Sequence, residues 1–404
     1  MTKKSGVPAI RFKGFTDTWE QRKLGDMADI IGGGTPSTSN SEYWDGDIDW
    51  YAPAEIADQI YVDSSDRKIT KQGFENSSAK MLPIGTVLFT SRAGIGKTAI
   101  LRKEACTNQG FQSIVPHNNE LDSYFIFSRT EELKRYGETN GAGSTFVEVS
   151  GKQMASMDIM MPKTIEEQKA IGQYFQNLDR LITLHQRKLE KLHNLKKAML
   201  AKMFPQNGSV YPEIRFAGFT DAWEQRKFGD LGSVAMCKRI FKEQTTTAGE
   251  IPFYKIGTFG GEPDAFISRE LFEEYKANFA YPEVGDMLIS ASGTIGRIVE
   301  YTGKDEYFQD SNIVWFKHDD RIDNTFLKCL YSIVEWSGIE GSTIKRLYND
   351  NFLKTEFMLP SVAEQSQVGT FFSRLDSLIT LHQRKPTDKK RAKISLGSFT
   401  LFSW

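Results

Sequence analysis

The sequence has few cysteines, no long apolar run and no excess of charge of either sign. Three cysteines lie far apart without a CxxC pair, so neither a disulfide framework nor a zinc site is indicated. No apolar stretch approaches the about 20 residues of a membrane span, and the basic N-terminal residues precede no apolar signal-peptide core. Lysine and arginine number 51 and aspartate and glutamate 52, so the composition favours neither DNA nor a membrane as partner. We expect a cytoplasmic protein with buried cysteines and no membrane association.

Motifs of several enzyme classes are also missing. The sequence has no NPP[YF] motif of amino-methyltransferases, no zinc-nuclease cluster and no pair of histidines at metal-binding spacing. SRAGIGKTAI at 91–100 resembles a phosphate-binding loop but lacks the glycine five residues before its Gly-Lys-Thr. Its flanks are apolar and β-branched on both sides, which predicts strand, turn and strand.

Two blocks of the sequence each occur twice. PAIRFKGFTDTWEQRKLGDM at 8–27 returns as PEIRFAGFTDAWEQRKFGDL at 212–231, with fifteen of twenty positions identical. We call these two stretches the lead-ins. A second block, EEQKAIGQYFQNLDRLITLHQRK at 166–188, matches AEQSQVGTFFSRLDSLITLHQRK at 363–385. A period of about 200 residues is too long for a solenoid, which indicates a duplicated domain.

Two variable regions, roughly 28–160 and 232–358, lie between the repeated blocks, and we call them the first and second modules. Short β-rich runs alternate there with turn clusters, and helical pieces stand at 123–137 and 325–338. The pattern predicts an α+β fold with a mixed or antiparallel sheet in each module. The β-rich runs are IDWYAP, TVLFTS, FQSIVP, IPFYKIG, DMLISAS and NIVWFK.

The modules share one landmark. GTVLFTSRAGIGKTAI at 85–100 aligns with GDMLISASGTIGRIVE at 285–300, where Arg297 replaces Lys97 and Ile298 replaces Thr98. A phosphate site could not lose both its lysine and its hydroxyl. The shared feature is therefore predicted to be a structural turn with a polar tip.

The second repeated block has the pattern of a long helix with a heptad seam. Apolar residues recur from Ile171 at steps of four and three, and a helix from about Glu166 to Met203 would span roughly 57 Å. The two seams are expected to pack against each other; packing of each helix on its own module is the alternative. The expected interface residues are Phe175, Leu178, Ile182, His185, Leu189 and Leu192 in the first copy, and Phe372, Leu375, Ile379 and His382 in the second.

The repeated blocks resemble a known family. RFxGFTDxWEQRKxGD before each module and EQxx[IV]xxxFxxLDxLITLHQRK after it are similar to the specificity subunit of type I restriction-modification systems, over about residues 8–385. The resemblance implies that each module is a target-recognition domain reading one half of a bipartite DNA site. It also implies that the helices form an antiparallel coiled coil that sets the spacer and docks methyltransferase subunits.

The same resemblance implies that this chain is not an enzyme by itself. Catalysis would belong to the methyltransferase and restriction-translocase subunits that join it on double-stranded DNA. S-adenosylmethionine, ATP and Mg²⁺ are expected in those partners, and no cofactor or metal is expected on this chain.

Residue types suggest where DNA would bind. Lysine and arginine bind phosphates, and arginine, lysine, asparagine, glutamine, serine and threonine read base edges. The turn glycines would let the backbone approach DNA closely. The candidates are Ser91, Arg92, Gly94, Gly96, Lys97, Arg67, Lys68, Gln109 and Gln112 in the first module, and Ser292, Thr294, Gly296, Arg297, Asn312, Lys345 and Arg346 in the second.

These observations predict five segments. Residues 1–162 form the first target-recognition domain with its lead-in, 163–204 the first conserved helix, and 205–361 the second domain with the repeated lead-in. The second helix, 362–386, is expected to end near Lys385, because Pro386 stands where the first copy has Leu189. Residues 387–404 are expected to be an aberrant tail, with which the subunit either assembles poorly with its methyltransferase partners or is a donor cassette rather than a working copy.

Two other functions remain open from the sequence. One is a nucleotide-binding enzyme that uses residues 91–100. The other is a bivalent scaffold or a protein that binds non-nucleic ligands such as carbohydrates, with Tyr43, Trp44, Trp50 and Tyr51 available to stack on sugars, although residues in this arrangement more often form a core.

Overall fold

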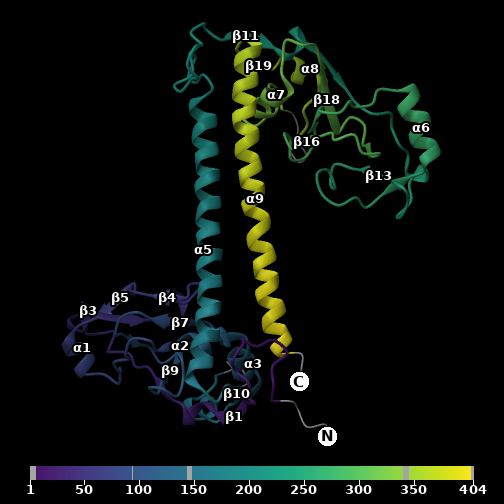
Figure 1. Cartoon of the computed structure of the whole chain (residues 1–404). Helices are drawn as coiled ribbons and strands as arrows, with labels where there is room; N and C mark the ends of the chain where they lie inside the picture. The colour runs from purple at the N-terminus through teal and green to yellow at the C-terminus, as the bar shows by residue number, and fades with distance from the viewer. Residues whose placement is uncertain (1–5, 93, 143–147, 340–344, 402–404) are drawn as a thin grey trace. The chain divides into compact units, whose positions relative to one another are not determined.

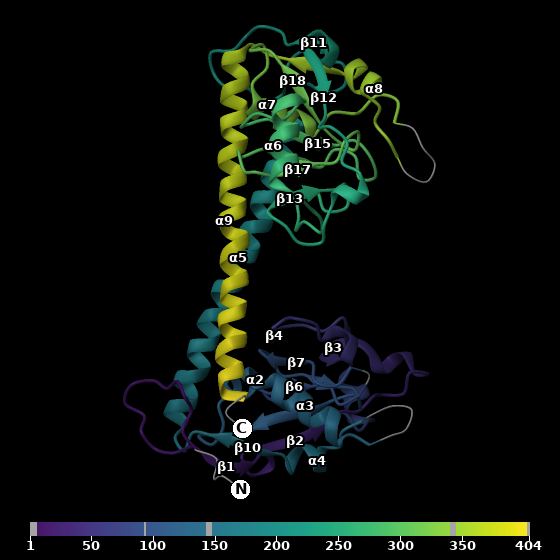
Figure 2. The same ribbon diagram turned by 90° about the vertical axis from the view of Figure 1, so that its right-hand side faces the viewer.

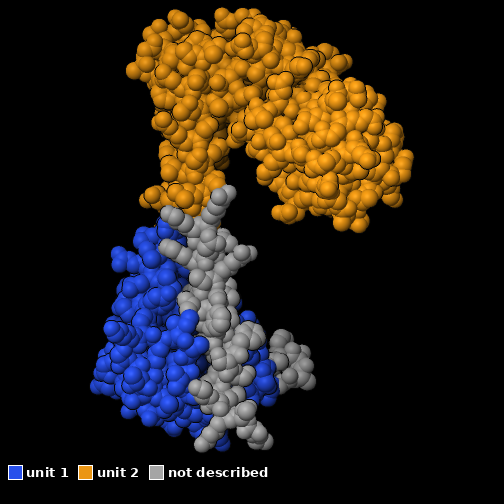
Figure 3. Space-filling model, turned by 45° about the vertical axis from the view of Figure 1, so that its right-hand side comes forward, with its two compact units in different colours: residues 1–185, 386–404 blue, residues 186–385 orange. Residues whose placement is uncertain are grey.

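The chain divides into two compact units, each with one copy of the repeat. The computed structural model describes residues 6–92, 94–142, 148–339 and 345–401, with side chains up to residue 383. Unit 1 comprises residues 1–185 and 386–404, and unit 2 comprises residues 186–385 (Figure 3). Two long helices, α5 (Ile165–Lys202) and α9 (Val362–Leu401), contribute residues to both units (Figure 1).

In its described residues the first module contains two small sheets and four short α-helices. Its larger sheet has the strand order β2-β9-β6-β7-β4, and its smaller sheet has the order β5-β3-β8. Figure 2 shows α4 beside β2. The strands are β2 (Ala28–Gly32), β3 (Trp44–Tyr51), β4 (Tyr61–Val62), β5 (Arg67–Ile69), β6 (Val87–Phe89), β7 (Thr98–Leu101), β8 (Cys106–Thr107) and β9 (Gln112–Pro116), and the helices are α1 (Lys71–Glu75), α2 (Ser123–Ser128), α3 (Thr130–Asn140) and α4 (Gly151–Ala155).

The second module repeats this topology with different residues. The order β12-β18-β15-β16 corresponds to β2-β9-β6-β7, and β14-β13-β17 corresponds to β5-β3-β8. In both small sheets the middle strand runs antiparallel to one neighbour and parallel to the other. The elements are β12 (Gly232–Ala235), β13 (Ile251–Tyr254), β14 (Phe266–Ile267), β15 (Met287–Ser290), β16 (Ile298–Glu300), β17 (Tyr307–Phe308), β18 (Ile313–His318), α6 (Arg269–Asn278), α7 (Asn324–Tyr331) and α8 (Asn349–Lys354).

The α+β prediction with mixed sheets is confirmed, and all six β-rich runs contain strands. The helical piece expected at 325–338 is too long, because α7 ends at Tyr331 and turns follow it. The three cysteines are buried as expected, and burial raises the pKa of each thiol to about 12.

In each copy the lead-in pairs with the strand that precedes the long helix. Strand β1 (Glu20–Lys23) of the first lead-in pairs with β10 (Asp158–Met161), which directly precedes α5. In unit 2, β11 (Glu224–Lys227) pairs with β19 (Glu356–Leu359) in the same register, just before α9. Each module is therefore closed at its base by a two-stranded sheet that pairs the repeated lead-in with the strand just before the long helix.

A buried ion pair joins each lead-in to the first turn of its helix. Arg11 donates two hydrogen bonds of 2.7 Å to the carboxylate of Glu167, and the indole of Trp19 donates a third at 3.2 Å. In unit 2, Arg215 and Trp223 bind Glu364 in the same way. Both carboxylates are at most 2% exposed. We call each set the clasp.

The residue after each clasp glutamate connects the helix to its module. Gln168 accepts a hydrogen bond from the amide of Asp122 and donates one to the carbonyl of Glu120. Gln365 makes the equivalent bonds to Asp323 and Arg321. The Glu-Gln pair at the start of each conserved helix thus holds a lead-in on one side and the cap of α2 or α7 on the other.

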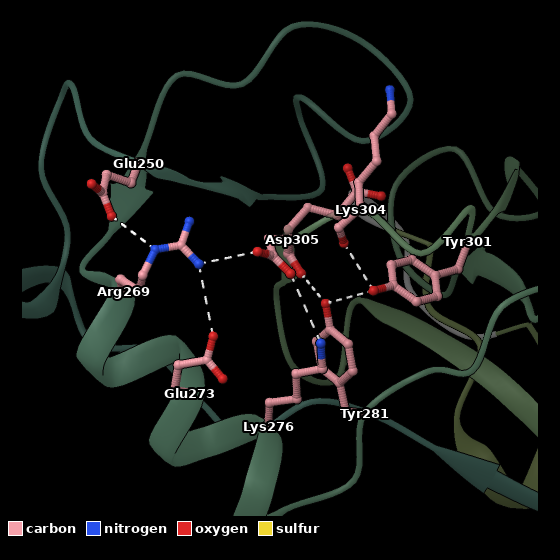
Figure 4. A network of polar contacts seen from close by, with 9 residues as sticks. Glu250, Arg269, Glu273, Lys276, Tyr281, Tyr301, Lys304 and Asp305 are labelled. Carbon is pink, nitrogen blue, oxygen red and sulfur yellow. Dashed lines mark hydrogen bonds and ion pairs between the residues drawn. The ribbon is translucent and has the colours of Figure 1, made fainter.

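The second module has its own polar network around α6. Arg269 lies 3.0 Å from Glu250 and 3.1 Å from Asp305, while the hydroxyl of Tyr281 lies 3.1 Å from that of Tyr301 (Figure 4). Tyr281 also donates to the carbonyl of Glu306. These bonds attach α6 and the loop after β16 to the small sheet of unit 2.

In unit 2 the last turns of α5 pack antiparallel along the first half of α9. Lys196, which interrupts the apolar seam, forms an ion pair with Asp376, and the ring of Phe204 lies 6.4 Å from that of Phe372. The predicted packing of the two seams is confirmed in this unit. Its apolar contacts come from Leu189, Leu192 and Met199 on α5, and from Phe372, Leu375 and Ile379 on α9, with His382 also buried.

The seam of unit 1 is described on one side only. Phe175 packs against the core of the first module, Ile182 is buried, and Leu178 and His185 are half-buried. The expected partners lie beyond residue 383, where the side chains are outside the described residues.

The predicted extent of the first helix is confirmed, whereas the predicted end of the second near Lys385 is wrong. Helix α9 continues through Pro386 to Leu401. Proline fixes φ near the helical value and removes one amide donor, so a helix can pass through it at a cost in free energy. The residues that follow, DKKRAK at 388–393, include strong helix formers that favour continuation.

Loss of one partner of the clasp should destabilise unit 1. Arg11→Met leaves the Glu167 carboxylate buried without its guanidinium, so we expect the free energy of unfolding to fall by about 3–5 kcal/mol. Chemical denaturation followed by circular dichroism measures the loss. As a control, Lys23→Met in the exposed Lys23–Asp158 pair should cost less than about 1 kcal/mol. The double variant Arg11→Met with Glu167→Leu should recover part of the stability, and no recovery would contradict the assignment of the loss to an unpaired charge.

Pro386 should weaken α9. Its nitrogen carries no proton for the carbonyl four residues earlier, so Pro386→Ala is expected to raise helicity and to stabilise the protein by up to about 3 kcal/mol. Far-UV circular dichroism and thermal unfolding provide the readout. Thr387→Ala, one position along, should gain less than about 1 kcal/mol. Indistinguishable melting curves for the natural chain and Pro386→Ala would argue against a strained passage through residue 386.

Candidate nucleic-acid interface

Both modules carry a turn held by a hydroxyl at the same position. Thr90 donates to the carbonyl of Gly94 at 2.7 Å and accepts from the amide of Lys97 at 3.0 Å. Ser290 makes the same two bonds, 2.6 Å to Thr294 and 2.8 Å from Arg297. The backbone closes each turn further through an amide-to-carbonyl bond of 3.0 Å, from Gly96 to Thr90 and from Gly296 to Ser290. The strand-turn-strand prediction is confirmed.

This geometry does not support a nucleotide site at residues 91–100. A phosphate-binding loop leads into a helix whose N-terminal amides bind the phosphates. Here the turn leads into strand β7, which begins at Thr98, and the amide of Lys97 already bonds to Thr90. The equivalent turn of unit 2 leads into β16. The nucleotide-binding alternative is therefore not favoured.

In the first module the turn exposes Lys97, leaves Arg92 half-buried and buries its serine. Lys97 is exposed beside a hollow lined by Asp58, Glu131 and other residues, and Arg92 lies 4.0 Å from Glu148. The side chain of Ser91 is 0% exposed, so the prediction that it contacts DNA from the surface is wrong for this conformation. A Cβ atom at Gly96 would lie 2.8 Å from the Cα atom of Lys134, so packing against α3 requires glycine there.

One other segment of the first module bonds to the turn, and a second segment bonds to the first. The amide of Ser91 donates to the carbonyl of Gly110 at 2.8 Å, and the hydroxyl of Thr35 donates to Gln109 at 2.6 Å. The sequence reasoning missed the segment around Thr35. Its signal is the Gly32-Gly33-Gly34 run, because a Cβ atom on Gly33 would come within 2.0 Å of the Asn108 carbonyl oxygen.

The remaining candidates of the first module lie apart from the turn. Arg67 and Lys68 stand on β5 in the smaller sheet, where the guanidinium of Arg67 lies 3.7 Å from the Trp44 ring centroid. Lys68 pairs with Asp49 at 2.9 Å. Burial raises the pKa of Asp49, but bonds from Ser65 and Lys68 outweigh that effect and leave the pKa below its ordinary value. Gln112 begins β9, where its side chain abuts Gly151.

The aromatic cluster of the first module is a core rather than a sugar platform. Trp44, Trp50 and Tyr51 are buried, and the two indole rings meet edge to face at 5.1 Å. Each indole nitrogen donates to a backbone carbonyl, of Ser37 and Gly34 respectively.

The second module gathers most of its candidates at one edge. The side-chain oxygen of Asn312 accepts from Ser292 at 2.8 Å and from Arg346 at 3.4 Å. The amide of Gly293 donates to the carbonyl of Lys345 at 3.0 Å, which places Lys345 beside the turn. Thr294, Arg297 and Lys345 are exposed, while Ser292 is buried and serves to hold Asn312.

Arg297 is fixed more firmly than its counterpart Lys97. Its guanidinium donates to the carbonyl of Phe259 at 2.7 Å, a bond from the turn to the loop after β13. Arg239 also reaches this edge through Asp310 at 2.9 Å, and the sequence reasoning missed it because it lies in a variable run without a repeated counterpart. Gly296, like Gly96, has a positive φ, of 90°.

A further tripeptide is repeated in the sequence of both modules. Gly-Ser-Thr occurs at 143–145 and 341–343, in segments outside the described residues. The residues that follow bond to the turn, because the amide of Val149 donates to the carbonyl of Ser91 and that of Leu347 to Ala291. The repeat is thus a signal in the sequence a few residues before Val149 and Leu347, which contact the turns.

A second duplicated surface lies on the helices. Leu181 and Leu184 on α5 are 43% and 50% exposed, and their counterparts Leu378 and Leu381 on α9 are both 46% exposed. We call these pairs the leucine faces. In unit 2 a hollow between α7 and α9 adjoins the leucine face and is lined by Thr325, Arg374 and other residues.

Neither a metal cluster nor a bilayer-length apolar helix occurs in the described ranges. Within them, no three side chains of histidine, cysteine, aspartate or glutamate gather as a metal site. No helix of the described chain combines the length and the apolar character that a bilayer span requires.

Comparison with known proteins relates the whole duplicated chain to one family. Residues 16–194 and 220–388 match the type I restriction modification DNA specificity domain. A putative type I restriction enzyme specificity subunit of Haemophilus influenzae is 52% identical over 153 residues, 38% of this chain and 40% of that protein. The type I restriction enzyme MjaIX specificity subunit of Methanocaldococcus jannaschii is 31% identical over 276 residues, 64% of this chain.

These alignments span 40% and 63% of the relatives' own lengths. The fold is similar to that of the S subunit of a type I restriction-modification system from M. genitalium, with a TM-score of 0.61, 13% identity and 98% coverage of both chains. Because the two family matches together span most of the chain, this protein belongs to the type I restriction modification DNA specificity domain family.

Proposed function

We propose that this chain is the DNA sequence-recognition subunit of a type I restriction-modification complex, in which each module reads one half of a bipartite site. The observation that carries the proposal is the duplicated, hydroxyl-held turn. Two modules with little sequence in common keep the same bonds at this turn while the side chains at its tip differ. A constant scaffold with variable tips suits two readers of different half-sites.

The chemistry of each edge suits a duplex. Exposed lysine and arginine can bind phosphates, and fixed asparagine, glutamine and arginine side chains can read base edges in the major groove. Arg346 and Asn312 hold each other in unit 2, which reduces the rotamer freedom lost on binding. The net charge of −1 fits a chain that shares its phosphate contacts with partner subunits.

The leucine faces favour two copies of one partner. Four exposed leucines stand at equivalent positions of the repeated helical block, and solvent-exposed apolar side chains that occur together mark interaction surfaces. We assign each leucine face to a methyltransferase subunit, the partner class that the family resemblance implies. Adenine methylation with S-adenosylmethionine, and ATP-driven translocation and cleavage with Mg²⁺, would then belong to methyltransferase and restriction subunits. The paired helices would act as the spacer between half-sites.

A bivalent scaffold for non-nucleic ligands is the weaker candidate. It draws no support from the aromatic cluster, whose indole rings are buried. It also gives no reason for two turns that keep the same backbone and hydroxyl bonds but differ at their tips.

Loss of charge at the first turn should weaken DNA binding. Arg92→Ala with Lys97→Ala is expected to lower the affinity for DNA. The slope of the logarithm of the binding constant against the logarithm of the salt concentration should also become shallower by about 1 for each phosphate that the chain no longer neutralises. Binding of the assembled complex is measured at several salt concentrations, on a duplex whose site comes from mapping methylated adenines in cells that make the complex. The charge-matched control is Arg102→Ala with Lys103→Ala, at the other end of β7. Identical salt slopes for both variants would remove the turn from the interface.

Charge placed on a leucine face should remove one partner at a time. With Leu181→Asp and Leu184→Asp, or with Leu378→Asp and Leu381→Asp, we expect one methyltransferase subunit per chain instead of two, because an ion cannot be buried unpaired. Native mass spectrometry of the co-expressed proteins counts the subunits. Leu195→Asp is the control, because Leu195 is exposed but its equivalent in the second copy is Ala392, so Leu195 belongs to no duplicated face. This variant should leave both subunits bound. Unchanged stoichiometry in both double variants would place the docking surface elsewhere.

A further inference from the structure

In each module a single side-chain pair joins the segment after the first strand to the loop after the short strand. The hydroxyl of Thr35, beyond β2, donates to the side-chain oxygen of Gln109, beyond β8, at 2.6 Å. In unit 2 the Nε atom of Arg239, beyond β12, donates to the carboxylate of Asp310, beyond β17, at 2.9 Å. We call Thr35–Gln109 and Arg239–Asp310 the bridging pairs.

The first members of the two pairs are equivalent in the repeat. Positions 35 and 239 lie 204 residues apart, as do positions 8 and 212, where the lead-ins begin. Each residue follows the strand that comes directly after the lead-in, and that strand pairs antiparallel with β9 or β18. The backbone therefore brings Thr35 and Arg239 to the same place in their modules.

The second members are equivalent as well. Gln109 and Asp310 are each the second residue after a short strand that pairs parallel with the middle strand of the small sheet. The residue before each is fixed to that middle strand. The amide of Asn108 donates to the carbonyl of the last residue of β3 at 3.0 Å, and that of Gln309 to the last residue of β13 at 2.9 Å. The two pairs thus occupy one position with different chemistry.

Both bridging pairs adjoin the hydroxyl-held turn. The carbonyl one residue after Gln109 accepts a bond of 2.8 Å from the amide of Ser91. The carbonyl two residues after Asp310 accepts one of 2.7 Å from the amide of Ala291. The pairs therefore belong to the edge that carries the candidate DNA contacts of each module.

One member of each pair is exposed and its partner holds it. Gln109 is exposed and Thr35 is half-buried, while the side chain of Arg239 is 61% exposed and that of Asp310 only 17%. The bond from Thr35 occupies one lone pair of the Gln109 oxygen, and leaves the second lone pair and the NH₂ group outside that bond. The bond to Asp310 uses Nε and leaves both terminal nitrogens of Arg239 outside it.

We propose that Gln109 reads an adenine in one half-site and Arg239 reads a guanine in the other. This inference rests on the proposed function. A glutamine amide matches N6 and N7 of adenine, and a guanidinium matches O6 and N7 of guanine. Thr35 and Asp310 are positioning residues, because a side chain that is held before binding loses less rotamer freedom on the base.

Mapping of methylated adenines in cells that make the complex tests the two readers. Gln109→Ala should make one A·T position of one half-site degenerate, and Arg239→Ala one G·C position of the other. At that position the preference of the assembled complex for the natural duplex over a singly substituted one should fall by roughly 5- to 100-fold. The half-site that does not change shows that the variant chain is folded. Arg226→Ala, in an exposed ion pair with Glu224 on β11, is the control and should leave both half-sites unchanged.

Matched variants test the positioning residues. Thr35→Val removes the hydroxyl at nearly constant volume, and Asp310→Ala removes the carboxylate; each should lower discrimination at the same base as its reader by about 2- to 10-fold. Thr35→Ser keeps a hydroxyl and should retain the adenine preference. A purely structural link would instead lower the melting temperature of the Thr35→Val chain and leave its base preference intact.

The outcomes separate this inference from the proposed function. If the natural complex methylates a bipartite site and both reader variants keep its motif, the two reading positions are wrong and the proposed function stands. An equal loss of affinity for every duplex would also overturn the inference, because the side chains would then bind phosphate. A natural complex that recognises no bipartite site would refute the proposed function and, with it, the two reading positions.

Discussion

The clasp is the contact on which each unit depends. A glutamate at the start of a long helix is buried, and it is tolerated there because an arginine and a tryptophan from the lead-in supply three hydrogen bonds. The pairing of β1 with β10, and of β11 with β19, brings the same segments together along the backbone. The constant blocks therefore bind each other, which leaves the module between them free to change its surface while its base remains closed.

The modules show how one scaffold can present different surfaces. Both hold the turn through the hydroxyl of residue 90 or 290, and both join it to the segment after the short strand β8 or β17. At the tips the chemistry differs: Lys97 is exposed beside a hollow, whereas Arg297 is tied to the carbonyl of Phe259. Under the proposed function, such differences in reach and rigidity would separate the two half-sites.

The helical blocks are less symmetric than their sequences suggest. Tyr124 at the start of α2 donates a hydrogen bond to Asp179 on α5. In unit 2 the residue equivalent to Tyr124 is Thr325 in α7, and Asp376, the equivalent of Asp179, pairs with Lys196 instead. The smaller threonine borders the hollow beside the unit 2 leucine face. The two leucine faces are thus alike in the helix and unlike in the adjoining module, and the tail after Pro386 adds a further difference between the copies.

The sequence by itself determined the duplication, the α+β modules, the strand-turn-strand landmark and the long first helix, because identity between copies, alternation and heptad spacing are local signals. The family assignment made from the sequence is confirmed by the domain match over both copies.

The sequence could not show that Arg11 contacts Glu167, which is 156 positions away, or that the side chains of Ser91 and Ser292 are buried, since burial depends on segments distant in the chain. It also misjudged α9, where proline's cost is one term among many along the helix. Only the tertiary structure decided which candidates share an edge, because backbone bonds from residues 110, 149, 312 and 345 to the turns set that grouping.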